Sequence, residues 1–289
     1  MPQPPRRRRA TLLISCPDRT GIVAAVSEFL ARFHGNLVHA DQHSDRSAGL
    51  FLQRLEWELD GFALPLDGFR REFTGIAERF DMTWELRSND RLPRVAILVS
   101  KQGHCLYDLL ARKRMGQLDA EIPLVIGNHR DLEEGARDFG APFAYLPVTD
   151  ETRDAQEDAL LERLEAARVN LVVLARYMQV LREKVLAQYP HRVINIHHSF
   201  LPAFAGARPY HRAHERGVKI IGATAHYATG DLDEGPIIEQ DVVRVSHRDS
   251  PRDLIAKGRD LEKIVLARAV ERHLADRILV YGNRTVVFD

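Results

Sequence analysis

The hydrophobic positions in the first 88 residues follow two periodicities. At 21–33 and 69–80 apolar side chains recur every three to four residues, as in helices with one buried face. Around and between them, short apolar or alternating runs predict strands at 11–15, 37–43, 50–59 and 82–86. The order strand-helix-strand-strand-helix-strand predicts a ferredoxin-like (βαββαβ) domain over residues 10–88.

The remainder of the chain has a different pattern, in which continuous apolar runs alternate with helical segments. Such runs are typical of parallel strands that are buried on both faces. Strands are predicted at 94–99, 122–126, 143–146, 171–174, 193–196, 220–227 and 237–245. Helices are predicted at 105–113, 132–139, 151–167 and 251–275, and a short hairpin over 278–288. This alternation predicts an α/β domain with a doubly wound, Rossmann-like sheet over 94–289, after a polar linker at 89–93.

Composition and charge narrow the class of protein. The 289 residues exceed the usual size of one domain, and 45% are hydrophobic and 28% charged, as in ordinary globular proteins. Lys+Arg and Asp+Glu are balanced at 41 each, so no overall field attracts nucleic acid or a membrane. Residues 1–9, with their run of arginines, are expected to be a disordered basic tail. No apolar run approaches the roughly 20 residues that span a bilayer, so a cytoplasmic protein is expected.

The end of the strand predicted at 193–196 carries the candidate chemistry. Asn195 and His197 are two residues apart, so a strand points both side chains to one face. Asp233 follows 36 residues after His197, in a turn-rich segment. An amide, an imidazole and a carboxylate can together stabilise an oxyanion, move a proton and orient a nucleophile. Taken singly, each residue also has an ordinary structural explanation, as a turn former or a satisfied histidine.

Four segments share a pattern with a known superfamily. The segments 195–197, 199–202, 222–226 and 232–238 read Asn-Ile-His, Ser-Phe-Leu-Pro, Gly-Ala-Thr-Ala-His and Leu-Asp-Glu-Gly-Pro-Ile-Ile. This pattern resembles the folate-dependent formyltransferases and hydrolases, which use 10-formyltetrahydrofolate. The resemblance implies that Asn195, His197 and Asp233 are catalytic and that His226 supports them. Asp231 lies two residues before the aspartate that matches, so the role is assigned to Asp233.

The same resemblance implies where the pterin ring of the folate binds. The segment Ala-Arg-Tyr-Met-Gln-Val-Leu at 175–181 supplies the candidates Met178, Gln179, Val180 and Leu181. The loop 228–234 is expected to close the other side of the ring, with Thr229 and Gly230 as its candidates. The alternative is that Met178, Val180 and Leu181 are core residues at a junction between a strand and a helix.

The first domain resembles an ACT domain, a regulatory module that binds small amino acids and pairs through its sheets. The motif Cys-Pro-Asp-Arg-Thr-Gly at 16–21 and the later Gly-Asn-Leu at 35–37 carry this resemblance. It implies an effector site at Asp18, Arg19, Gly21 and Asn36, with glycine or methionine as the effector, and a homodimer or homotetramer. The alternatives are that Asp18 caps a helix and that Asn36 is a turn residue.

An ACT domain joined to this catalytic unit resembles the formyltetrahydrofolate deformylases. The implied reaction is hydrolysis of 10-formyltetrahydrofolate to formate and tetrahydrofolate, which would balance folate pools and supply formate for purine synthesis. No permanently bound cofactor and no metal are expected, since Cys16, Cys105 and the histidines show no ligand spacing. Two other functions remain open at this point: formyl transfer to an unidentified amine, and a folate-binding protein that senses an amino acid.

Overall fold

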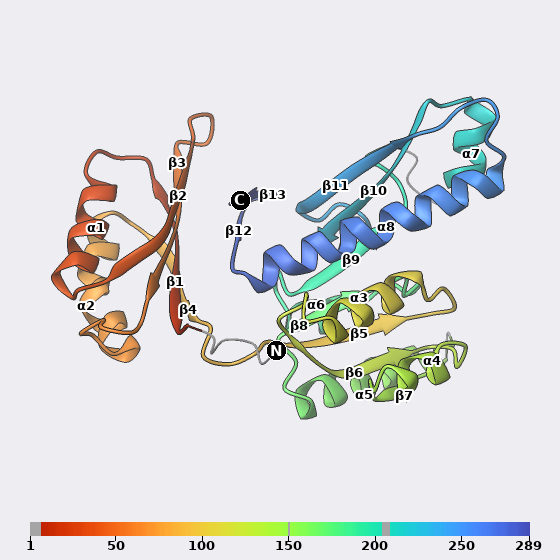
Figure 1. Cartoon of the computed structure of the whole chain (residues 1–289), viewed down its shortest axis with the longest axis horizontal. Coiled ribbons are helices and arrows are strands. Elements are labelled where there is room, and N and C mark those ends of the chain that lie inside the picture. Colours follow the sequence, from red (N-terminus) through yellow and green to blue (C-terminus); the bar gives the residue numbers. More distant parts are fainter. Residues whose placement is uncertain (1–6, 150, 204–208) are drawn as a thin grey trace. The chain divides into compact units, whose positions relative to one another are not determined.

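The computed structural model describes residues 7–149, 151–203 and 209–289. These form two compact units (Figure 1). The first comprises the chain up to Arg91 together with 276–279 and 286–289, and the second comprises 92–275 and 280–285. The break between Arg91 and Leu92 lies inside the predicted linker at 89–93.

The first unit is a four-stranded antiparallel sheet with two helices. Its strand order is β2-β3-β1-β4, as expected for a ferredoxin-like fold. The core is aromatic: Trp57 stacks on Phe69, which stacks on Phe73, and all three side chains are fully buried. The elements are β1 (Arg9–Pro17), α1 (Ile22–Arg32), β2 (Asn36–Asp45), β3 (Leu50–Glu58), α2 (Leu66–Arg79) and β4 (Thr83–Ser88).

Both ends of the chain differ from the prediction. Residues 1–6 of the predicted tail lie outside the described residues. Arg7 and Arg8 form ion pairs with Glu58 and Asp90, and Arg9 begins β1, so the prediction of disorder was wrong for these three residues.

The segments 276–279 and 286–289, predicted as the end of the second domain, group instead with the first unit. Contacts of Asp276 with the first unit explain this grouping. Its carbonyl oxygen accepts a hydrogen bond from Arg54 Nε at 2.8 Å, and its carboxylate pairs with Arg87 at 2.7 Å.

The second unit is built on a seven-stranded sheet in the order β11-β10-β9-β8-β5-β6-β7. The five strands from β9 to β7 are parallel, and their order is that of a doubly wound sheet whose connections reverse direction between β5 and β8. The strands are β5 (Arg94–Val99), β6 (Glu121–Gly127), β7 (Phe143–Tyr145), β8 (Leu171–Leu174), β9 (Val193–His197), β10 (Ile220–Tyr227) and β11 (Ile237–Arg244).

Helices pack on this sheet as the alternation predicts (Figure 1). Leu160 and Leu164 of α5 share a buried cluster with Ala96 and Leu98 of β5. The helices predicted from the sequence are α3 (His104–Arg114), α4 (Glu133–Asp138), α5 (Arg153–Ala166) and α8 (Pro251–Leu274), and β12 (Ile278–Tyr281) and β13 (Arg284–Val287) form the hairpin.

Two short helices were not predicted. The helix α6 (Glu183–Leu186) has only four residues, and α7 (Pro209–Arg216) reads Pro-Tyr-His-Arg-Ala-His-Glu-Arg, with few apolar residues. A single turn and a mostly polar segment both lack a recognisable apolar stripe.

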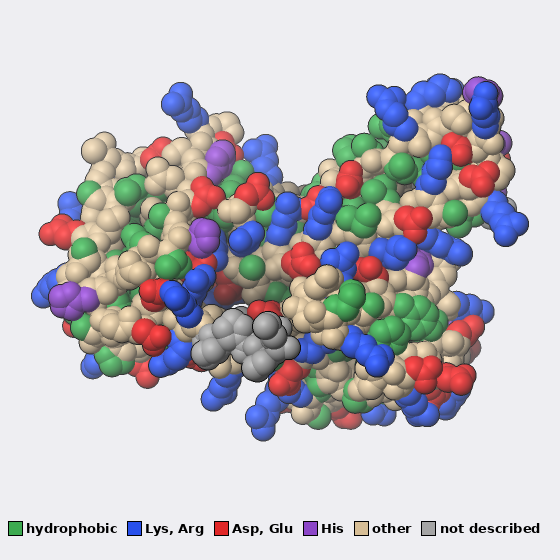
Figure 2. All heavy atoms as spheres, in the orientation of Figure 1, with side chains coloured by type: hydrophobic (Ala, Val, Ile, Leu, Met, Phe, Trp, Pro, Cys, Tyr) green, Lys and Arg blue, Asp and Glu red, His purple; other side chains and the backbone are tan. Residues whose placement is uncertain are grey.

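The surface fits the neutral composition. On the face drawn in Figure 2, Lys and Arg side chains are interspersed with Asp and Glu side chains over both units. In the part of the chain that the structure describes, no helix combines the length and the apolar character needed to cross a membrane.

Candidate active site

The pairing of β9 with β10 brings the first two candidate residues together. The strands are antiparallel, and Asn195 lies directly opposite His226. Residues opposite each other across such a pair point to the same face, and His197 points there too, two residues along β9. Asn195 Nδ2 donates a hydrogen bond to His226 Nε2 at 3.2 Å, and His226 Nδ1 donates to the carbonyl oxygen of Tyr227 at 3.0 Å. These two bonds hold the buried His226 ring in one orientation.

Asp233 reaches the same place from the loop between β10 and β11. Its backbone has φ 60°, a left-handed conformation that aspartate tolerates better than most residues. Gly235 allows this loop to close, because a Cβ there would collide with the carbonyl oxygen of Tyr227. Asp231, by contrast, is exposed, and its carbonyl oxygen accepts a bond within the turn from Thr229. The structure therefore brings Asp233, rather than Asp231, to the histidines.

The Asp233 carboxylate is held ionised by its neighbours. Its Oδ1 lies 3.1 Å from His197 Nδ1 and 3.7 Å from His226 Nε2. The hydrogen bond from His197 and the proximity of His226 hold the pKa of Asp233 well below its usual range, although burial opposes this shift. Both contacts use Oδ1, so Oδ2 remains able to accept a proton from a water molecule.

His197 lines the same cavity as Asp233, and its other ring nitrogen is left without a partner in the described part of the chain. The residue is 6% exposed, and Nε2 has no hydrogen-bond partner among the described residues. A buried polar atom without a partner is uncommon and marks a position where a ligand can bind. The loop after β9 is fixed by Thr224, whose hydroxyl accepts from the Leu201 amide and donates to the Ser199 carbonyl.

These side chains line a cavity of about 590 Å³. Its wall includes Asn195, His197 and Asp233, and also residues that follow β5 and β8, the two strands between which the connections of the sheet reverse direction. Doubly wound sheets bind their ligands at this point, beyond the carboxyl ends of the strands. The volume lies in the usual range for small-molecule sites, about 300–1,000 Å³.

Comparison with known proteins agrees with this arrangement. The model of the formyl transferase family matches residues 93–270, and that of the ACT domain matches residues 10–60. The formyltetrahydrofolate deformylase of Synechocystis sp. is 60% identical over 279 residues, which cover 96% of this chain and 98% of the relative. The chain belongs to the formyltetrahydrofolate deformylase family. The Escherichia coli K12 relative of the same name is 42% identical over 97% of this chain and 98% of its own length.

Solved structures agree with the family in fold as well. A formyltetrahydrofolate deformylase from Pseudomonas syringae pv. tomato superimposes with a TM-score of 0.95 at 49% identity, covering 99% of this chain and 96% of that one. A glycinamide ribonucleotide transformylase from Symbiobacterium toebii is similar over 71% of this chain and 98% of its own, with a TM-score of 0.66 and 33% identity. The transformylase therefore shares only part of the chain, whereas the deformylase shares both units.

Of the residues predicted to bind the pterin ring, some line the cavity and others do not. Met178, Gln179 and Val180 line the cavity, and Met178 and Val180 are 63% and 47% exposed, so these two are not core residues. Leu181 is 5% exposed and packs in the core beside α5, as the alternative interpretation expected. The half-buried Thr229 and the exposed Gly230 are not among the residues that line the cavity.

A polar wall of the cavity was not assigned from the sequence. It is formed by Gln102, Arg176, His198, Tyr210, His211, Arg259 and Glu262. At its centre Glu262, 1% exposed, accepts hydrogen bonds from Tyr210 at 2.7 Å and His104 at 2.8 Å. Burial raises the pKa of Glu262, but the His104 bond and the Arg176 charge outweigh it, so the pKa lies below the ordinary value. The signal in the sequence was a glutamate within the inward stripe of α8.

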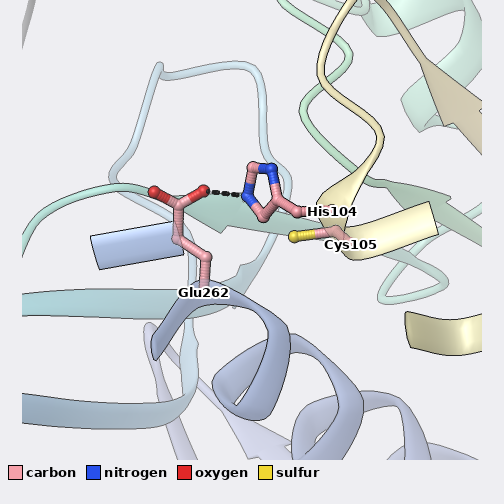
Figure 3. Close-up of side chains that lie close together, drawn as sticks. All are labelled: His104, Cys105 and Glu262. Carbon is pink, nitrogen blue, oxygen red and sulfur yellow. Dashed lines mark hydrogen bonds and ion pairs between the residues drawn. The ribbon is translucent and has the colours of Figure 1, made fainter. Parts of the chain in front are cut away.

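Glu262 of this wall also belongs to a group of side chains of the metal-ligating type. The ligand atoms of His104, Cys105 and Glu262 lie within 4.8 Å of one another, and the side chains approach from α3 and α8 (Figure 3). His104 and Glu262 are already joined by a hydrogen bond, and burial raises the pKa of the Cys105 thiol well above its usual value. A metal would have to break that bond and deprotonate that thiol. The expectation that the reaction needs no metal stays a prediction.

Three of the effector candidates lie before or at the start of α1, and the fourth, Asn36, lies at the other end of the sheet. Asn36 is opposite Glu58, which pairs with Arg9 at the start of β1, whereas Asp18 follows the end of β1 at Pro17. The structure therefore does not bring Asn36 to the other three. Asp18, Arg19, Gly21 and Asn36 are all exposed. The N-cap of α1 is Gly21 at φ 95°, and no side chain bonds to it, so the alternative that Asp18 caps the helix was wrong. Arg19 pairs with Asp81, and Asn36, at the start of β2, bonds to Glu58. Asp18 keeps its carboxylate free of any capping role.

Proposed function

We propose that this protein hydrolyses 10-formyltetrahydrofolate to formate and tetrahydrofolate, with Asn195, His197 and Asp233 as its catalytic residues. The observation that carries the proposal is the unpartnered Nε2 of His197, which lies in a cavity beside a carboxylate whose pKa is lowered. The likeness over both units to relatives named as deformylases favours hydrolysis over transfer.

The geometry suggests a role for each group. Asp233 Oδ1 orients His197 through Nδ1, so that Nε2 points at the formyl oxygen. Protonated His197 and the amide of Asn195 donate hydrogen bonds to the oxyanion that forms when water attacks the formyl carbon. Asp233 Oδ2 takes the proton that this water loses and passes it to N10 as the carbon–nitrogen bond breaks. His226 keeps Asn195 and Asp233 in place.

The folate would bind with its pterin ring against the exposed side of the cavity. Met178 and Val180 provide apolar surface there, and Gln179 lies between them in the sequence. Apolar walls with a few polar groups are typical of sites for small flat ligands. Thr229 and Gly230 would act only through the loop that carries Asp233. By balancing the folate pools, the reaction would supply formate for purine synthesis.

Release of formate by the purified protein tests the function. We expect wild type to release one formate for each tetrahydrofolate formed, and Asp233→Asn to lose at least about 100-fold in kcat, the size typical of a catalytic group. The matched control is Asp231→Asn, the same change two residues away on an exposed side chain. Equal rates in wild type and Asp233→Asn would reject the assignment. Turnover that needs an added amine and yields no formate would favour a transferase.

We also propose that the first unit binds a small amino acid, glycine or methionine, at Asp18, Arg19 and Gly21; Asn36 lies at the other end of the sheet and is left out of this site. The exposed Asp18 carboxylate suits the amino group of such a ligand. The strand β2 lies at the edge of its sheet and pairs only with β3 among the described strands. An open edge of this kind can pair with a second copy, which supports a homo-oligomer. Calorimetry with each amino acid would distinguish the two effectors.

A further inference from the structure

Arg176 is a buried cation in the cavity wall that the catalytic mechanism does not use. It lies two residues after the end of β8, at the reversal point of the sheet, and is 8% exposed. Its backbone has φ 64°, a left-handed conformation that is uncommon for a residue with a long side chain. Such conformations persist where the surrounding structure holds the residue in place, and they concentrate at functional sites.

The hydrogen-bonding capacity of Arg176 is not consumed by its ionic neighbour. Its Nε lies 3.6 Å from Glu262 Oε2, which is beyond hydrogen-bond distance, and has no hydrogen-bond partner among the described residues. Glu262 is already bonded through Oε1 to Tyr210 and through Oε2 to His104. The carboxylate therefore balances the charge of the guanidinium and leaves its donors available to a ligand.

A guanidinium with free donors is suited to a carboxylate, because the fork of N–H groups matches two oxygens. The proposed hydrolysis makes one small carboxylate, formate, when the water oxygen is joined to the formyl carbon. We propose that Arg176 binds formate at the polar wall of the cavity after the carbon–nitrogen bond breaks. This inference rests on the proposed function. The same wall includes Gln102, His198, Tyr210 and Glu262.

The same groups keep the binding weak enough for release. Glu262 lies close to Arg176 and reduces the local positive potential. Burial, followed by the charges of Arg176 and His197, lowers the pKa of His198 to about 4, so its imidazole adds no second cation at neutral pH. One guanidinium opposed by one carboxylate gives a site that holds an anion briefly.

Binding of ¹³C-labelled formate to the folate-free protein, followed by NMR line broadening at constant ionic strength, tests this site without turnover. Arg176→Gly removes the guanidinium and leaves a residue that adopts positive φ readily. We expect at least about tenfold weaker binding in Arg176→Gly, the loss typical of a charge-assisted pair. Arg176→Lys keeps a charge without the fork and should weaken binding by about threefold or more. The matched control is Arg259→Gln, an exposed cation of the same cavity, with a change below about twofold.

The outcomes separate this site from the proposed function. A wild-type protein that releases formate but does not bind it more strongly than chloride would overturn the formate site and leave the hydrolase intact. If Arg176→Gly does not fold, Arg176→Lys decides, and binding equal to wild type in that variant overturns the inference. A protein that binds formate through Arg176 but releases none from the folate would instead overturn the hydrolase.

Discussion

Consecutive histidines in this protein acquire different properties from their surroundings. His197, at the end of β9, bonds through Nδ1 to a carboxylate. The next residue, His198, has its ring centroid 5.0 Å from that of His197 and 6.0 Å from that of Tyr210. Burial there lowers the pKa of His198 to about 4. Two identical side chains therefore have different surroundings in one cavity: one is bonded to a carboxylate, and burial disfavours the protonation of the other.

The lowered pKa of His198 makes the stability of the second unit depend on pH. The unfolded chain takes up this proton near the ordinary value of 6.5, whereas the folded chain does so near 4. Between these values the unfolded state binds more protons, so the contribution of His198 to stability falls as the pH falls from about 6.5 to about 4. We expect urea midpoints to fall across this window and His198→Asn to flatten the slope. An NMR titration that places the pKa of His198 above 6 would contradict this account.

The sequence could predict Asn195 and His197 together because a strand alternates its side chains, and this rule needs no knowledge of neighbouring strands. It could not predict that His226 lies opposite Asn195, since that depends on the register between β9 and β10. Arg176 and Glu262 could not be predicted as site residues for a similar reason. Arg176 follows the apolar run of β8, and Glu262 lies within the apolar stripe of α8. Only the packing of these elements brings the two side chains to one cavity.

At the scale of elements, the strands with continuous apolar runs were the most predictable. Arg94–Val99 and Leu171–Leu174 have the predicted bounds, because continuous apolar runs of that length are typical of a strand that is buried on both faces. Ile220–Tyr227 also has the predicted bounds, although Gly222, Thr224 and His226 interrupt its apolar residues. The helix α7 was missed, although it supplies Tyr210 to the cavity. Its position depends on Tyr210 packing against α8, a contact that local sequence does not encode.

Gly258, inside α8, leaves room for α7 to pack against this helix. Helix propensity alone says that replacing an interior glycine with alanine stabilises a protein by about 0.5–1 kcal/mol. A Cβ at Gly258, however, would collide with the Tyr210 ring, which is bonded to Glu262. We therefore expect Gly258→Ala to lower the thermal unfolding midpoint, and to weaken formate binding because Glu262 loses a donor.

The matched control is Gly75→Ala, in the interior of α2. Nothing lies within 4 Å of a Cβ at Gly75, and the residue is exposed, so this change should raise stability by the usual amount of about 0.5–1 kcal/mol. Calorimetric unfolding of both variants is the measurement. A rise in both midpoints would show that Tyr210 moves aside at little cost.

At the scale of the whole molecule, the first unit is discontinuous in sequence. The chain leaves it at residue 91 and returns to it at 276, directly after α8. This was not predictable from periodicity, which treats neighbouring residues as one domain. The return depends on two arginines that contact Asp276: the buried Arg54, 222 residues earlier, and the half-buried Arg87, 189 residues earlier. Long-range hydrogen bonds and ion pairs of this kind have no local signature.

The contacts of Asp276 imply that removing the end of the chain destabilises the beginning. Deleting residues 276–289 removes the carbonyl oxygen that accepts from Arg54 Nε, and a hydrogen bond to a charged group contributes about 1.5–3 kcal/mol. Both tryptophans, Trp57 and Trp84, pack in the core of the first unit, so their fluorescence reports on its unfolding. We expect the deletion to lower the midpoint of the fluorescence transition by several degrees.

The variant Asp276→Asn keeps the carbonyl oxygen and loses only the ion pair with the half-exposed Arg87. It should therefore lower the midpoint by less than the deletion does. A fluorescence midpoint that the deletion leaves unchanged would show that the first unit is stable without its distant segment.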